Sequence, residues 1–132
     1  MASIFTRIVN GDIPCWRVAE SDNCFAFLDI NPLSKGHTIV IPKKEVDYIF
    51  DLGDDLYNDL FAFAKNVAVA LKESIPCKRV GVAVIGMEVP HAHIHLIPIN
   101  SESDMDFRKK RVVLSKEEFA DIAESILKSY QK

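Results

Sequence analysis

The 132-residue sequence has only three cysteines, and no two of them form a C-x-x-C pair. Cys15, Cys24 and Cys77 are too few and too scattered for a disulfide framework, so we expect reduced thiols. The sequence also lacks a hydrophobic run of transmembrane length, and its first residues lack the apolar stretch of a secretory signal peptide. We therefore expect a cytoplasmic protein that does not bind membranes.

An excess of positive charge is also missing. Lysine and arginine total 16 against 19 aspartates and glutamates, which gives a formal net charge of −3. Broad attraction to nucleic acid is therefore not expected. Hydrophobic residues make up 48% of the chain and charged residues 27%, as in ordinary globular proteins. No repeat or boundary divides the sequence, so we expect one domain over residues 1–132.

Histidine is scarce, but three of the four histidines fall within five consecutive positions. His91, His93 and His95 alternate with apolar residues in the stretch HAHIHLIP. A period of two is typical of a strand, in which successive side chains leave on opposite faces. The pattern predicts a strand over residues 91–98 that carries all three imidazoles on one face.

The remaining hydrophobic pattern predicts an α+β fold. We expect further strands at residues 16–20, 24–29, 37–41 and 79–85, a short helix at 4–9, a long helix between 51 and 75, and a C-terminal helix up to Tyr130. Ser115 and Glu118 fit the capping box that starts the last helix. Short turns join successive strands, which favours a five-stranded, mainly antiparallel sheet.

Three interpretations of the clustered histidines remain open from the residues alone. The first is the solvated polar face of a half-buried strand. The second is a metal site, in which H-x-H supplies two ligands and His37, Asp29 or Glu88 supplies another. The third is nucleophilic catalysis by His93, with the neighbouring imidazoles donating hydrogen bonds to an anionic phosphoryl centre.

The stretch HAHIHLIP resembles the H-φ-H-φ-H-φ-φ signature of the histidine triad family, in which φ is a hydrophobic residue. Four further blocks follow the family order, at residues 3–5, 8–14, 27–30 and 36–43. The resemblance implies a HIT-like α+β fold, a homodimer with a continuous larger sheet, and a purine nucleotide substrate such as an AMP derivative. Nothing in the residues demands a catalytic metal, and we expect no cofactor.

The resemblance also implies roles for the histidines. His93 resembles the nucleophile that becomes nucleotidylated, and His95 resembles the residue that bonds the α-phosphate oxygens. His91 resembles the residue whose backbone carbonyl orients His93, and His37 resembles a fourth histidine that supports the triad.

The nucleotide-binding residues are implied in the same way. Asp29 matches the carboxylate that bonds the ribose hydroxyls, although an Asp before Asn31-Pro32 is also typical of a turn cap. The expected apolar walls around the base are Ile4, Phe5, Ile8, Phe27 and Ile30.

The loop before the triad departs from the better-known members of the family. Gly86 and Glu88 are expected at the nucleotide, but Met87 stands where many members have Gln, and Glu88 where many have a small hydroxyl residue. Ile85 takes the place of a typical Asn. We therefore expect a nucleotide phosphoramidase or a dinucleoside polyphosphate hydrolase, with a catalytically weak nucleotide- or partner-binding protein and a metal-dependent hydrolase as alternatives. The basic cluster 108–111 is expected to be a solvated loop.

Overall fold

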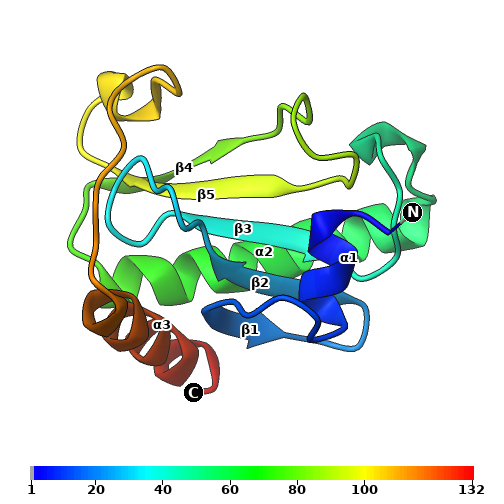
Figure 1. Ribbon diagram of the computed structural model, residues 1–132, viewed down its shortest axis with the longest axis horizontal. Helices are drawn as coiled ribbons and strands as arrows, with labels where there is room; N and C mark the ends of the chain where they lie inside the picture. Colours follow the sequence, from blue (N-terminus) through cyan, green and yellow to red (C-terminus); the bar gives the residue numbers. More distant parts are fainter. Residues whose placement is uncertain (1) are drawn as a thin grey trace.

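The computed structural model describes residues 2–132, and a five-stranded sheet forms its centre (Figure 1). The strands are β1 (Arg17–Glu20), β2 (Cys24–Leu28), β3 (Thr38–Pro42), β4 (Arg79–Ala83) and β5 (Ile94–Ile99). Their order across the sheet is β1-β2-β3-β5-β4, and every neighbouring pair is antiparallel. The predicted α+β class and the antiparallel sheet are confirmed.

The helices are α1 (Ile4–Val9), α2 (Asp54–Ser74) and α3 (Lys116–Tyr130), with short 3₁₀ helices η1 (Ile49–Asp51) and η2 (Glu102–Met105). Helix α3 begins with the predicted capping box: the Ser115 hydroxyl accepts the N–H of Glu118, and the Glu118 carboxylate accepts the N–H of Ser115. Helix α1 begins at Ser3, whose hydroxyl accepts the Thr6 N–H. Within residues 2–132, none of the helices has both the length and the apolar composition that crossing a membrane requires.

The sheet is covered on both faces, because its central strands alternate between two apolar clusters. Helices α2 and α3 cover one face and α1 lies on the other (Figure 1). In β2, Ala26 and Leu28 pack toward α2, while Phe25 and Phe27 join Phe5 of α1. This alternation explains why every residue of β2 and β3 is buried. The short helix α1 is thereby held against the sheet beside the histidines.

The predicted strand over residues 91–98 is wrong at its start, because β5 begins at Ile94. Its first residues bond to loops instead of a neighbouring strand: the N–H of His91 donates to Val89 O, and the N–H of Ala92 donates to Val46 O. The predicted strand at 79–85 likewise ends early, at Ala83. His91 and His93 therefore precede the sheet, and only His95 lies within it.

The sheet register brings the fourth histidine to the triad. Strand β3 pairs with β5 so that Ile39 lies opposite His95 and Thr38 opposite Leu96. His37 directly precedes Thr38, so its side chain lies at the same end of the pair. His37 and His95, which are more than fifty positions apart in the sequence, thus lie next to each other at one end of the β3–β5 pair.

Candidate active site

A cavity of about 370 Å³ lies at the junction of α1, β5 and the loop before β5. Both His93 and His95 line it. The other lining residues are Ile4, Phe5, Asp29, Ile30, Asn31, Ile39, Ile85, Gly86, Met87, Glu88, Val89, Phe107 and Arg111. The cavity therefore combines an apolar wall, two imidazoles and three charged side chains.

His93 has one ring nitrogen fixed and one free. Its Nδ1 lies 2.8 Å from the backbone oxygen of His91. A carbonyl oxygen only accepts, so Nδ1 carries the proton and donates it. In the neutral ring, Nε2 therefore holds an unshared electron pair. The Phe5 ring packs edge-on against the imidazole at 5.1 Å between centroids, which holds its orientation. The arrangement can present Nε2 as a nucleophile.

Both ring nitrogens of His91 form hydrogen bonds within the protein. Its Nε2 donates to the carbonyl oxygen of Pro42 at 2.8 Å, and its Nδ1 lies 2.8 Å from the Ser3 hydroxyl, which donates to it. The Thr6 hydroxyl lies 3.3 Å from the same Nδ1 and donates to a Glu45 carboxylate oxygen at 2.6 Å. The N–H of Ser3 donates to the same oxygen. The expectation that both flanking imidazoles donate to an anionic substrate is therefore wrong for His91, which has no free ring nitrogen.

A relay of hydrogen bonds sets the protonation of His95. The backbone N–H of Leu33 donates to His37 Nδ1 at 3.0 Å, so neutral His37 carries its proton on Nε2. That Nε2 lies 2.9 Å from His95 Nδ1 and donates to it. His95 consequently carries its own proton on Nε2, the nitrogen not used within the protein. His95 can thus donate a hydrogen bond to a ligand while remaining neutral.

The surroundings keep these histidines neutral. Burial, together with a neighbouring imidazole and the Arg111 guanidinium, lowers the pKa of His37 to about 3 and that of His95 to about 4. Burial also lowers the pKa of His91, and its bond to the Pro42 carbonyl partly offsets this. Near pH 7 the tautomers described above for His37, His91 and His95 are therefore the relevant forms.

The predicted carboxylate lies in the cavity, where it also caps a turn. Asp29 Oδ1 accepts the N–H of Asn31 at 2.8 Å, so the turn-capping interpretation is confirmed as well. Burial raises the pKa of the Asp29 carboxyl, while the Asn31 N–H and the charge of Arg111 oppose the rise. Asp29 Oδ2 is 3.6 Å from His37 Nε2, too long for a hydrogen bond, so that N–H belongs to His95.

The expected apolar walls divide into two groups. Ile4, Phe5 and Ile30 line the cavity, and Ile30 is 69% exposed at its mouth. Ile8 and Phe27 lie instead in the apolar cluster behind Phe5, with the Phe5 and Phe27 rings 5.4 Å apart. These two residues support the wall without forming its surface.

Two lining residues were missed by the sequence analysis. Phe107 packs against His95 with ring centroids 5.0 Å apart, and Arg111 lies over the Phe107 ring at 5.7 Å. Both belong to the segment between β5 and α3, where the basic cluster is expected to be solvated. That expectation holds for Arg108, whose side chain is 92% exposed, and is wrong for Arg111. No local pattern distinguishes these two arginines, because the difference depends on how the segment folds back over His95.

The HIT domain model matches residues 10–102, which is most of the chain. Adenosine 5′-monophosphoramidase hnt1 of Schizosaccharomyces pombe is 36% identical over 128 residues, with 96% of each chain covered. The chain belongs to the HIT family. The predicted histidine triad resemblance is thereby confirmed.

Solved HIT structures agree with the fold. A HIT-like protein involved in cell-cycle regulation from Bartonella henselae superposes with a TM-score of 0.83 at 26% identity, covering 96% of this chain and 95% of that one. A zinc-bound histidine triad family protein from Mycobacterium smegmatis gives a TM-score of 0.82 at 26% identity, covering 99% and 94%. The five-stranded antiparallel sheet and its helices are therefore those of a HIT fold.

The zinc-bound neighbour raises the question of whether the HIT histidines here suit a metal. Within residues 2–132, one group could offer three ligand atoms within 4.8 Å of one another: Asp29, His37 and His95. The hydrogen bonds do not fit such a site, because the Leu33 N–H occupies His37 Nδ1 and leaves the proton on Nε2. A protonated Nε2 has no electron pair for a metal. The group is better explained as a hydrogen-bond relay.

Proposed function

We propose that the protein hydrolyses a purine nucleotide derivative at its α-phosphate through a covalent nucleotidyl intermediate on His93. The observation that carries this proposal is the His93 Nδ1–H bond to the His91 carbonyl, which leaves Nε2 with its electron pair at a cavity. The fission yeast relative is named a phosphoramidase, which supports a nucleotide hydrolase. Its 36% identity along almost the whole chain supports assigning the same kind of activity to this protein. We favour a phosphoramidate over a dinucleoside polyphosphate.

In the first step, the Nε2 electron pair of His93 attacks phosphorus opposite the leaving group. The new N–P bond forms as the P–N or P–O bond breaks, and the leaving group departs with the bonding electron pair, an amine leaving group taking up a proton from solvent. The His91 carbonyl stabilises the positive charge that develops on the His93 ring, because it accepts Nδ1–H throughout. The His95 Nε2–H donates to a phosphoryl oxygen as its negative charge increases.

In the second step, a water molecule attacks the same phosphorus and the N–P bond breaks. The water gives up a proton to solvent, the electron pair of the N–P bond returns to His93 Nε2, and a nucleoside monophosphate is released. Asp29 bonds the ribose hydroxyls, and Ile4, Phe5 and Ile30 contact the base. Nothing in either step draws on a metal, which agrees with the unsuitable tautomer of His37.

A trapping experiment tests the proposal. The protein is mixed with an adenosine phosphoramidate, quenched in base to preserve the N–P bond, and digested for mass spectrometry. We expect an adenylyl group on the peptide that contains His93, formed equally with and without a chelator. Substrate binding without adduct or turnover would instead support the alternative of a catalytically weak binding protein. Turnover that a chelator abolishes would support the metal-dependent alternative.

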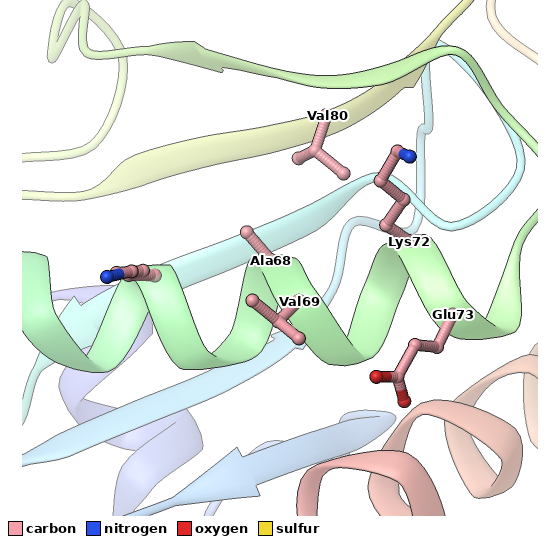
Figure 2. Close-up of a pocket in the computed structure, with 6 residues that line it drawn as sticks. Ala68, Val69, Lys72, Glu73 and Val80 are labelled. Carbon is pink, nitrogen blue, oxygen red and sulfur yellow. The ribbon is translucent and has the colours of Figure 1, made fainter.

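We also propose a homodimer formed along β4. This strand is one of the two edge strands of the sheet, and Val82 is 57% exposed on it. A second cavity, of about 450 Å³, lies between β4 and α2, away from the histidines (Figure 2). Its apolar lining residues are Ala68, Val69 and Val80, and Val69 is 53% exposed. A second copy of the chain that pairs its own β4 in antiparallel fashion would cover this surface and continue the sheet. Light scattering at monomer mass would contradict this proposal.

A further inference from the structure

Arg111 is fixed at the cavity by bonds to two different segments. Its Nη1 donates to the carbonyl oxygen of Asn31 at 2.8 Å, and its Nη2 donates to that of Phe107 at 3.1 Å. The guanidinium also lies over the Phe107 ring. The backbone N–H of the next residue, Val112, donates to Pro32 O at 2.9 Å, which ties the chain to the same loop. The guanidinium is thus held in place before any ligand binds.

The cavity needs such a cation if its ligand is a phosphate. Among the described residues that line it, Arg111 is the one lysine or arginine, whereas Asp29 and Glu88 are both acidic. His95 and His37 remain neutral near pH 7 because of their burial. His95 therefore contributes a hydrogen bond without a full charge. The fixed positive charge at this site comes from Arg111.

We propose that Arg111 is a phosphate-binding residue of this site and that it pairs with the anionic oxygens of the bound nucleotide. The inference rests on the proposed nucleotide hydrolysis and adds a residue to it. The Phe107 ring links Arg111 to His95, because the guanidinium lies 5.7 Å from the ring centroid and the His95 ring packs against it at 5.0 Å between centroids. A guanidinium has five N–H donors, and the two carbonyl bonds leave others free for a ligand. The segment between β5 and α3 thereby becomes part of the nucleotide site.

A binding experiment on the full chain tests this proposal. AMP and adenosine differ by the phosphate alone, so their affinities are compared by calorimetry for the wild type and for Arg111→Gln. We expect Arg111→Gln to weaken AMP binding by about 10- to 100-fold, the scale of a lost charge-assisted hydrogen bond, and to leave adenosine binding unchanged. Arg111→Lys should recover part of the loss, since it keeps the charge but not the planar donor geometry. Arg108→Gln is the matched control in the same segment and should change neither affinity.

The possible outcomes distinguish a failure of this inference from a failure of the proposed function. An equal loss of AMP and adenosine affinity in Arg111→Gln would show a structural role and overturn the inference. Unchanged AMP affinity in a variant that still forms the His93 adduct would overturn the inference alone. A wild-type protein that binds AMP no more tightly than adenosine and forms no adduct would overturn the proposed function together with it.

Discussion

The two walls of the cavity differ in how firmly their groups are held. On one wall lie His93 and His95, which His91 and His37 support by hydrogen bonds; all four are at least 91% buried, and each ring has a nitrogen bonded to a fixed partner. On the other wall, the loop over residues 84–90 exposes its side chains. Met87 is 86% exposed and Ile85 is 50% exposed. The groups that the proposed reaction uses for attack and charge stabilisation are positioned before substrate arrives, whereas the other wall has few fixed polar groups.

This difference separates two parts of the reaction. Attack and charge stabilisation depend on preorganised groups, whose contribution is large because no reorganisation is needed during the reaction. In the proposed reaction the leaving group meets exposed side chains, whose contributions are smaller and more easily changed. Substitutions in the histidine wall should therefore affect every substrate strongly. Those in the loop should change the preference among substrates.

The largest effect is expected for His93→Gly, which removes the attacking nitrogen. Turnover of an adenosine phosphoramidate should fall by about 10³-fold or more, the scale seen when a catalytic nucleophile is deleted. AMP affinity should remain within a few-fold of wild type, because the apolar wall and Asp29 are unchanged. Added imidazole should restore part of the turnover by filling the vacated space. A variant that keeps wild-type turnover would contradict the role of His93.

The next effect is expected for His37→Phe, which removes the N–H donated to His95. His95 is then free to change tautomer or rotate, so kcat should fall by about 10- to 100-fold, as when the orienting partner of a functional histidine is lost. His37→Gln is the matched control, because its amide can still donate an N–H. The kcat of His37→Gln, measured by steady-state kinetics, should lie between those of His37→Phe and wild type. Equal losses in the two variants would show that packing alone matters at this position.

A smaller effect is expected for Glu88→Ser in the exposed loop. The carboxylate disfavours an anionic leaving group, so its removal should raise turnover of a dinucleoside polyphosphate by a few-fold relative to a phosphoramidate. Competition assays with the two substrates in one tube measure this ratio directly. Glu102→Ser, an exposed substitution in η2, serves as the control. The same ratio in Glu88→Ser and wild type would exclude Glu88 from leaving-group selection.

The smallest effect is expected in the free energy of unfolding at acidic pH. The pKa of His37 is about 3 in the folded protein against about 6.5 when unfolded, so between these values the unfolded chain binds the extra proton. The free energy of unfolding should therefore fall by about 1–2 kcal/mol as pH drops from 6.5 to 5. The lowered pKa of His95 acts in the same direction, and the raised pKa of Asp29 opposes it. In denaturant titrations, the free energy of unfolding of His37→Gln should depend less steeply on pH than that of wild type. An equally steep dependence would contradict the assignment of this effect to His37.

Local sequence patterns predict most of the fold and the centre of the site. Short apolar runs bounded by turn residues identify β2 and β3, and the capping box at Ser115 identifies the start of α3. The family blocks correctly bring Asp29 to the same cavity as His93, and they bring His37 within 2.9 Å of His95, which also lines that cavity. These features depend on short-range periodicity or on motifs with fixed spacing. Both can be read along the chain.

The features that could not be predicted depend on long-range contacts. The start of β5 at Ile94 follows from the Ala92 N–H bonding to Val46 O, a partner 46 positions away in sequence. The position of Arg111 follows from its bond to Asn31 O, 80 positions away. The use of both His91 nitrogens depends on Ser3 and Pro42, which belong to distant segments. No periodicity in the sequence encodes such pairings.

The most direct test of the account is to determine which atom of the protein carries the phosphorus. The base-stable adenylyl adduct can be isolated after trapping and its linkage assigned by correlated ¹⁵N and ³¹P nuclear magnetic resonance. Because Nδ1 of His93 is held by the His91 carbonyl, we predict an N–P bond at Nε2 of His93 and at no other nitrogen. An adduct at Nδ1 of His93, or on a different histidine, would contradict the account.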